Sequence, residues 1–203
     1  MPGDRTTDPV TAPVVPPAAG VRNVANLLTL IRLLLVPVFG WLLFGHPAES
    51  GYRWAAVVVF VVASLTDRLD GKLARDRGLV TELGTLADPI ADKALMGTAL
   101  VGLSAAGELA WWVTVVILVR ELGITALRFW VIRQGVIPAS RGGKLKTILQ
   151  AVAIGLYLLP LPAVLHPVSV AVMAAAVVAT VVTGVDYVVS AVRRSRSGAH
   201  SRP

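Results

Sequence analysis

One stretch of the sequence decides the fold. Residues 54–74, WAAVVVFVVASLTDRLDGKLA, run from apolar side chains straight into two aspartates. The apolar part, Trp54 to Leu65, gives only about 18 Å of helix, whereas the hydrocarbon core of a bilayer is about 30 Å thick. The helix must therefore continue through Asp67 and Asp70 to complete a crossing. This pattern predicts a helix that carries carboxylates at the depth of one membrane leaflet.

The composition is that of an integral membrane protein. Hydrophobic residues make up 55% of the chain and charged residues only 15%, a balance that soluble domains of this size do not show. The chain has no cysteine, which excludes disulfides, thiolate metal sites and a cysteine nucleophile.

Apolar segments recur along the chain at lengths that suit membrane helices. Open sheet edges cannot be satisfied in lipid, so we expect an all-α integral membrane protein, a bundle of six transmembrane helices. The segments are 27–44, 54–74, 86–106, 110–132, 147–165 and 168–192. Residues 1–20, with five prolines, predict a disordered cytoplasmic tail; residues 21–194 form the membrane domain and residues 195–203 a basic tail.

The distribution of lysine and arginine predicts the orientation. The connections on one side of the bundle hold a single basic residue, Arg53. The other side collects Arg22, Arg68, Lys72, Arg75, Arg77, Arg133, Arg141, Lys144, Lys146 and the basic tail. By the positive-inside rule both termini are cytoplasmic. We attribute the net charge of +7 to contact with anionic lipid and expect no nucleic-acid binding.

Two pairs of carboxylates share helix faces. Asp67 and Asp70 lie three residues apart, and Asp88 and Asp92 lie four apart. The segment that carries the second pair also needs residues 84–93 to complete its crossing, so both pairs lie toward the cytoplasmic leaflet. Carboxylate oxygens gathered in this way suit Mg²⁺ or Mn²⁺, and two such ions form the usual clamp for displacement at phosphorus.

Other residues of this region indicate how a ligand could approach. Gly71 and Ala74 lie on the face of Asp67 and Asp70, where small side chains let a ligand come close to the backbone. Pro89 lacks an amide hydrogen, so the third helix either starts close to it or kinks there.

The region resembles the signature of the CDP-alcohol phosphotransferases. Eight fixed positions match at the family's spacing: Asp67, Asp70, Gly71, Ala74, Arg75, Gly84, Asp88 and Asp92. The resemblance implies a six-helix, homodimeric membrane enzyme that cleaves CDP-diacylglycerol, passes its phosphatidyl group to an alcohol and releases CMP.

The resemblance also implies roles for these residues. The four aspartates would hold the metal ions, with Asp92 as the general base for the incoming hydroxyl. The nucleotide side would be lined by Asp70, Gly71, Ala74, Arg75 and Gly84. An aspartate base agrees with the histidines, because His46 and His166 fall on the outer side and His200 in the tail.

Further residues resemble the branch of the family that uses glycerol 3-phosphate. They are Asn26, Thr29, Arg32, Arg120, Glu121, Arg128, Gly143, Lys144, Lys146 and Thr147. Ala25 replaces the proline usual before the asparagine, which affects the helix start. Arg120, Arg128, Lys144 and Lys146 form a basic set suited to the acceptor's phosphate, with Asn26, Thr29 and Arg32 as supporting residues. We expect Glu121 to pair with a neighbouring arginine.

The resemblance implies that glycerol 3-phosphate accepts the phosphatidyl group at a site facing the cytoplasm of a bacterial cell membrane. The product would be phosphatidylglycerophosphate. Within the family, a cardiolipin synthase or a phosphatidylinositol-phosphate synthase is the alternative. A divalent-cation transporter would also place carboxylates inside a membrane bundle, but the outer halves of segments two to six lack acidic residues and mark no through-path.

Overall fold

A computed structural model of the protein describes residues 24–45, 49–76, 82–131 and 141–199. Within these ranges it leaves out the side chains of residues 24–28, 67–76, 82–88, 128–131, 141–142, 144 and 191–199. The described chain forms six α-helices, one 3₁₀-helix and no strand, which confirms the all-α class. The elements are α1 (Val24–Gly45), α2 (Ser50–Asp76), α3 (Glu82–Ala105), α4 (Trp111–Val131), α5 (Arg141–Leu158), the 3₁₀-helix η2 (Ala163–Leu165) and α6 (His166–Ala199).

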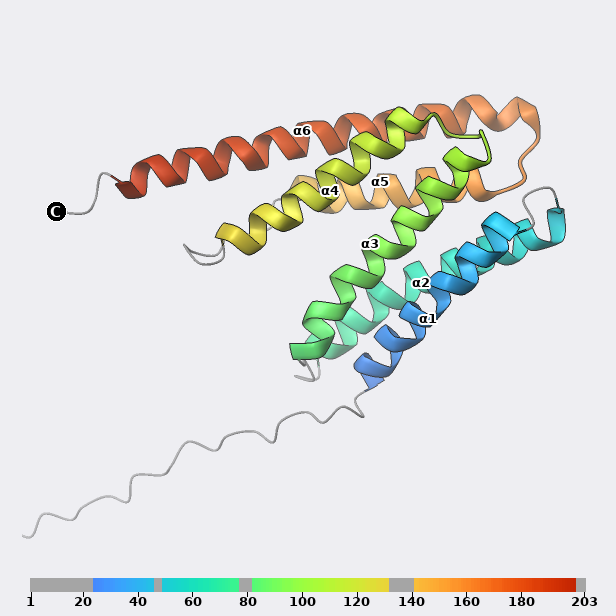
Figure 1. Cartoon of the computed structure of the whole chain (residues 1–203), viewed down its shortest axis with the longest axis horizontal. Coiled ribbons are helices and arrows are strands. Elements are labelled where there is room, and N and C mark those ends of the chain that lie inside the picture. The colour runs from blue at the N-terminus through green and yellow to red at the C-terminus, as the bar shows by residue number, and fades with distance from the viewer. Residues whose placement is uncertain (1–23, 46–48, 77–81, 132–140, 200–203) are drawn as a thin grey trace, which may run out of the picture.

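Successive helices run in opposite directions (Figure 1). The ends of α1, α3 and α5 and the starts of α2, α4 and α6 lie at one end of the bundle, which we call the turn end. At the opposite end, the terminal end, α1 begins and α6 finishes. α1 packs on α2 and α3, α6 packs on α5 and α4, and α5 joins the two groups by packing on α2 and α3.

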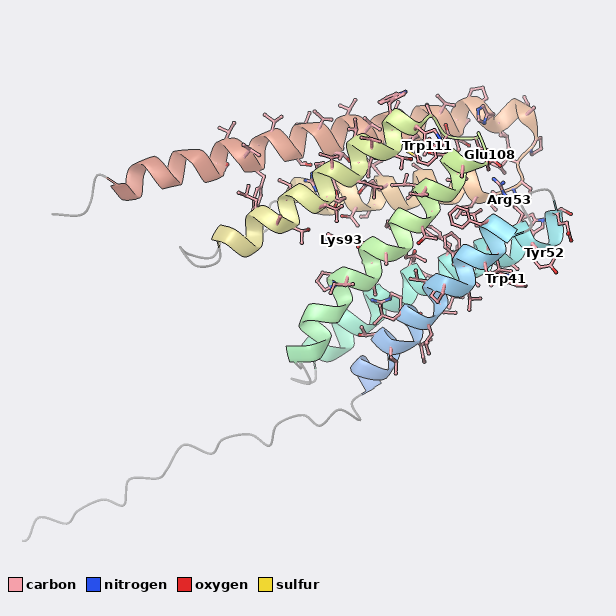
Figure 2. The ribbon with its side chains drawn as sticks, in the orientation of Figure 1. Trp41, Tyr52, Arg53, Lys93, Glu108 and Trp111 are labelled. Atoms are coloured by element: carbon pink, nitrogen blue, oxygen red, sulfur yellow. The ribbon has the colours of Figure 1, made fainter. Side chains whose placement is uncertain are left out.

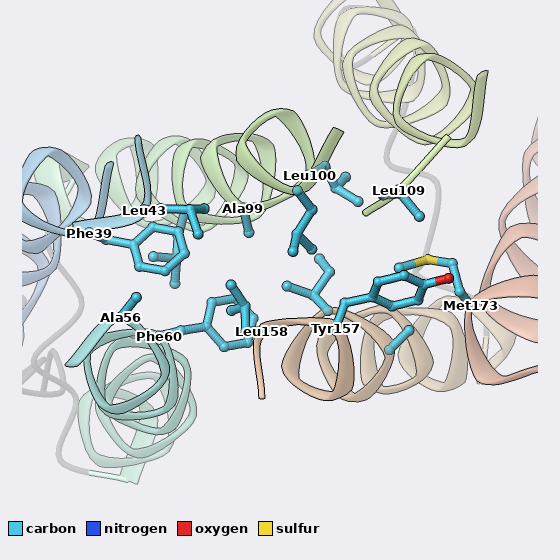
Figure 3. Packing of buried hydrophobic residues seen from close by; sticks show 14 of the residues in the cluster. Phe39, Leu43, Ala56, Phe60, Ala99, Leu100, Leu109, Tyr157, Leu158 and Met173 are labelled. Atoms are coloured by element: carbon cyan, nitrogen blue, oxygen red, sulfur yellow. The ribbon is translucent and has the colours of Figure 1, made fainter. Parts of the chain in front are cut away.

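Apolar side chains from both groups form one core (Figure 3). Phe39 of α1 and Phe60 of α2 pack with their ring centroids 6.0 Å apart, and Leu158 of α5 is fully buried beside them. Small residues let the helices approach closely. Gly102 of α3 lies against Leu43 of α1, with which a Cβ atom at position 102 would collide.

The turn between α3 and α4 depends on a glycine. Gly107 has a φ of +76°, a left-handed conformation that side chains disfavour. The amide of Gly107 donates to the Ser104 carbonyl at 3.0 Å, and that of Glu108 to the Leu103 carbonyl at 3.0 Å. These two bonds form a Schellman motif, which ends α3 and satisfies its last carbonyls.

The helix bounds correct one of the sequence predictions. α5 begins at Arg141 and ends at Leu158, so the predicted segment 147–165 is wrong at both ends. Pro160 and Pro162 follow α5 and cannot donate the amide hydrogens that would prolong it. α3 begins at Glu82 and continues through Pro89, so it does not start at the proline. α6 runs from His166 to Ala199, and the basic tail of residues 195–203 stays a prediction. The predicted tail 1–20 lies outside the described residues.

One helical stretch of the described chain has both the length and the hydropathy of a membrane span, Ala163–Ser190, with a mean hydropathy of 2.3. The apolar stretches Thr29–Gly45, Ser50–Thr66 and Leu145–Leu158 are shorter. All six helices nevertheless expose large apolar side chains on their outer surfaces. Examples are Leu34, Val58, Ile90, Val119, Val152 and Val182.

Candidate active site

The predicted metal-binding residues lie on two helices. α2 is helical as far as Asp76, so the predicted continuation of the helix through its acidic motif is confirmed. Asp67, Asp70, Gly71 and Ala74 fall on one face of α2 by the helical period, and Arg75 follows them. α3 carries Gly84, Asp88 and Asp92. Asp92 is the one aspartate of the four whose side chain is described.

A cavity of about 50 Å³ lies between α3, α4 and α5. Its polar lining includes Asp92 and Lys93 of α3, Glu121 of α4 and Lys146 of α5; Figure 2 labels Lys93. A space of this size holds a few water molecules. Asp92 and Lys146 come from two motifs that are far apart in the sequence, and the fold brings them to the wall of one cavity.

Glu121 connects two cations, the buried Lys146 and the partly buried Arg120. Its Oε1 atom accepts a hydrogen bond from the Lys146 ammonium and one from Arg120 Nη1 at 2.8 Å. The expected pairing of Glu121 with a neighbouring arginine is therefore confirmed. Lys146 is only 4% exposed, so its charge is removed from bulk water and depends on the carboxylate for compensation.

The Arg120 side chain of α4 is hydrogen bonded to α6. Its Nη2 donates to Thr183 Oγ1 at 2.9 Å. Beside that bond lies Gly184, where a Cβ atom would stand 3.1 Å from Arg120 Cγ. Glycine at this position thus leaves room for the arginine. The sequence analysis missed Thr183 and Gly184; their signal is a hydroxyl and a missing side chain, adjacent inside a largely apolar helix.

The remaining predicted site residues lie on α1, α4 and α5. Thr29 and Arg32 of α1 are buried, with 4% and 1% of their surface exposed. Buried polar residues in an apolar helix face the interior of a bundle, and the supporting role of these two stays a prediction. Asn26, Arg128 and Lys144 belong to α1, α4 and α5, and their side chains lie outside the described set.

The carboxylates have the chemistry of a magnesium or manganese site. Among the side chains that the structure describes, no group of three or more His, Cys, Asp or Glu residues could hold a metal ion. That set does not include Asp67, Asp70 and Asp88. The four predicted ligands offer only carboxylate oxygens, the donors that Mg²⁺ and Mn²⁺ prefer.

A larger cavity of about 520 Å³ lies at the turn end. Its lining includes Arg53, Glu108, Tyr157 and His166 but none of the residues predicted for the site. The smaller cavity is the better candidate because it combines an aspartate of the signature with a buried cation.

Fold and site together define an all-helical protein with carboxylates and a buried cation at a cavity between its helices. Residues 22–182 match the family model of the CDP-alcohol phosphatidyltransferases. Because this match covers most of the chain, the protein belongs to the CDP-alcohol phosphatidyltransferase family. Because this is a family of transferases, the family match favours an enzyme over the alternative of a divalent-cation transporter.

Several bacterial proteins are similar over most of the chain. A Mycobacterium tuberculosis protein named "Probable phosphatidylglycerophosphate synthase" is 60% identical over 176 residues, 86% of this chain and 84% of that protein. A Bacillus subtilis protein named CDP-diacylglycerol–glycerol-3-phosphate 3-phosphatidyltransferase is 35% identical over 81% of this chain and 93% of its own length. An Escherichia coli protein of the same name is 40% identical over 65% of this chain and 74% of its own length.

Proposed function

We propose that this protein transfers the phosphatidyl group of CDP-diacylglycerol to glycerol 3-phosphate, giving phosphatidylglycerophosphate and CMP. The names of the similar bacterial proteins support this substrate pair. The structural observation that carries the proposal is the cavity that joins Asp92 to the buried Lys146. A carboxylate beside a compensated cation suits an acceptor that presents both a hydroxyl and a phosphate.

The donor would be bound by the signature residues. Asp67, Asp70, Asp88 and Asp92 would hold one or two Mg²⁺ or Mn²⁺ ions, which supply charge neutralisation to the diphosphate of CDP-diacylglycerol. The nucleotide side would be lined by Gly71, Ala74, Arg75 and Gly84. The small residues of this set, on α2 and α3, would allow close approach of the cytidine group.

The transfer forms one P–O bond and breaks another. The acceptor's hydroxyl oxygen attacks the phosphorus of the phosphatidyl group while Asp92 takes the hydroxyl proton. The bond from that phosphorus to CMP breaks, and CMP leaves with the electron pair. The acceptor's phosphate would be bound by Arg120, Arg128, Lys144 and Lys146. This binding would hold the acceptor's hydroxyl in line for attack.

We further propose that all six helices span a bacterial cell membrane, with the terminal end in the cytoplasm, and that the protein is a homodimer. The alternating helix directions, the apolar outer surfaces and the basic residues near the terminal end support this arrangement. Trp41, Trp54, Trp111 and Trp112 are exposed near the turn end, where interfacial anchors are expected. A site at leaflet depth lets the diacylglycerol part stay in the membrane during transfer.

The acceptor is tested with purified protein, CDP-diacylglycerol and a panel of acceptors. We expect release of CMP and formation of phosphatidylglycerophosphate from glycerol 3-phosphate, loss of activity with EDTA, and recovery with Mg²⁺ or Mn²⁺. Use of phosphatidylglycerol or inositol 1-phosphate instead would identify a cardiolipin synthase or a phosphatidylinositol-phosphate synthase. It would overturn the choice of acceptor but leave the family unchanged.

The basic set is tested by its effect on the acceptor alone. Each charge-assisted bond is worth about 1.5 to 3 kcal/mol, so Arg128→Ala or Lys144→Ala should raise the KM for glycerol 3-phosphate by roughly 10 to 150 fold. The KM for CDP-diacylglycerol should stay within about twofold. Arg141→Ala, at the start of α5, is the matched control, because we assign its charge to the membrane flank.

A further inference from the structure

The Glu121–Lys146 pair crosses a space between two helices. In the part of the chain that the structure describes, α4 and α5 each pack on α3 and α6 but make no close backbone contact with each other. The ion pair bridges them at the wall of the 50 Å³ cavity. The carboxylate therefore decides where the Lys146 ammonium stands relative to Asp92, which lines the same cavity.

The Lys146 side chain is long enough to point out of the bundle instead of into it. Its ammonium is carried on a flexible stem of four carbons. Lys146 lies only about 7.5 Å along α5 from Arg141, where the helix begins. An unrestrained ammonium at such a depth extends toward the headgroups and water. Lys146 is instead 4% exposed and hydrogen bonded to Glu121, so the partner on α4 keeps the charge inside the bundle.

Glu121 is itself supported from α6. Arg120 donates to Glu121 Oε1 with one terminal nitrogen and to Thr183 with the other, and the arginine stem rests on Gly184. Three helices thus contribute to the position of one carboxylate oxygen. Support of this kind reduces the number of conformations that a charged side chain must give up when it binds a ligand.

The charges of the cluster favour an anion. Arg120 and Lys146 bring two positive charges, and Glu121 compensates one of them. The ammonium of Lys146 gives one of its three hydrogens to Glu121, which leaves two donors for another acceptor. Phosphate oxygens are suitable partners for such a fixed, partly compensated cation.

We propose that Glu121 is a positioning residue, which holds the Lys146 ammonium at the cavity beside Asp92 so that Lys146 receives the phosphate of the acceptor. The inference rests on the proposed transfer to glycerol 3-phosphate. Glu121 itself makes no contact with the acceptor, and its effect on catalysis passes through Lys146.

The test is a double-mutant cycle in the full-length protein, purified in detergent. Glu121→Gln removes the charge and keeps the size, Lys146→Met removes the ammonium, and the third variant combines both. We expect Glu121→Gln to raise the KM for glycerol 3-phosphate roughly 10 fold, with the KM for CDP-diacylglycerol within about twofold. The double variant should be no worse than Lys146→Met alone, because Glu121 then has nothing left to position. Glu121→Asp should recover part of the loss.

The sign of the effect separates positioning from repulsion. If Glu121 acted only as a negative charge near an anionic substrate, its neutralisation would lower the KM for glycerol 3-phosphate, and the proposal would be overturned. The proposal would also be overturned by an unchanged KM for glycerol 3-phosphate in Glu121→Gln, whether or not the melting temperature falls. Additive effects in the double variant would overturn it as well.

A pair of glycine variants tests the support from α6 without substituting any charged residue of the cluster. Gly184→Ala places a Cβ atom against Arg120 and should raise the KM for glycerol 3-phosphate. Gly123→Ala on α4 meets no atom within 4 Å and should not. Equal effects of the two variants would contradict the proposal.

The proposed function and the proposed role of Glu121 are overturned by different results. Wild-type protein that forms no phosphatidylglycerophosphate would overturn the acceptor assignment, whereas normal wild-type turnover with an unchanged KM in Glu121→Gln would overturn only the role of Glu121.

Discussion

Arg53 and Glu108 form an ion pair with two hydrogen bonds at the turn end, where Nη1 donates to Oε1 and Nη2 to Oε2 (Figure 2). The same guanidinium donates to the carbonyl oxygens of Leu158 at 3.0 Å and Tyr157 at 2.7 Å. These carbonyls close α5, and helix ends leave such groups without partners in their own helix. Arg53 therefore joins α2, the turn after α3 and the end of α5.

Loss of Arg53 should cost more stability than loss of the Glu108 charge. Arg53→Met leaves two carbonyls without their donors, at about 1 to 3 kcal/mol each, whereas Glu108→Gln weakens a pair that is 35% exposed on the Glu108 side, at about 1 kcal/mol. Thermal unfolding of the purified protein should show the larger drop in Tm for Arg53→Met. Both variants should keep the wild-type KM values, because the pair lines the turn-end cavity, which contains none of the residues predicted for the site. A larger drop for Glu108→Gln would contradict the role of Arg53 at the end of α5.

Packing between α1 and α3 should be sensitive to one methyl group. Gly102→Ala would drive a Cβ atom into Leu43, which is buried at 4% exposure and has little room to move. We expect a loss of about 1 to 3 kcal/mol in the free energy of unfolding. Gly97→Ala on the same helix meets Leu118 at an ordinary 3.5 Å and should be neutral or slightly stabilising. Unfolding in denaturant would compare the two, and equal stability would show that the helices adjust.

The aspartates of the signature should be needed for turnover but not for folding. Asp67→Asn, Asp88→Asn and Asp92→Asn each remove one negative charge from a crowded site, so the proteins should insert and purify normally. Release of CMP should fall by at least about 100 fold for Asp92→Asn, the lower range for loss of a general base. It should also fall for Asp67→Asn and Asp88→Asn, which would each lose a proposed metal ligand. Glu49→Gln, an exposed carboxylate just before α2, is the control and should keep wild-type turnover. Near-normal turnover of Asp92→Asn would remove its assignment as the base.

The proposed orientation can be read by labelling, because the chain has no native cysteine. Cysteines at Ala106 and at Val164, which is 80% exposed, should react from outside intact cells with a reagent that does not cross membranes. A cysteine at Ser197 should react only after the cells are opened. Gly107 is a poor labelling position because its φ of +76° would be strained by a side chain. The reverse pattern would place the terminal end outside the cell.

The sequence predicted the helices well where apolar runs end in polar residues. α2 and α4 lie within a few residues of their predicted bounds. α5 was predicted wrongly because its first turns are polar, from Arg141 to Thr147, whereas the apolar run continues past Leu158 through two prolines. Hydropathy follows the apolar run, but the helix follows backbone hydrogen bonding, which prolines interrupt.

The sequence predicted two of the residues that line the cavity but not the contacts that support them. Carboxylate spacing placed Asp92 on the right helix, and the basic motif included Lys146. The contact of Arg120 with Thr183 spans 63 positions of sequence, and no local pattern marks which face of α6 meets α4. Such a contact depends on the way the helices pack, which the sequence of either helix alone does not specify.

The unequal apolar lengths of the helices have a consequence for biogenesis. In the proposed membrane arrangement, Ala163–Ser190 has the length and hydropathy to enter lipid on its own, whereas Thr29–Gly45 and Leu145–Leu158 are short, and α2 carries the two aspartates of its acidic motif. A helix of the second kind is stable in lipid only after its polar positions are covered by neighbours. The earlier helices are therefore expected to wait at the translocon for partners. α6, which follows these helices in the described chain, would then complete their release by covering α4 and α5 and fixing Arg120.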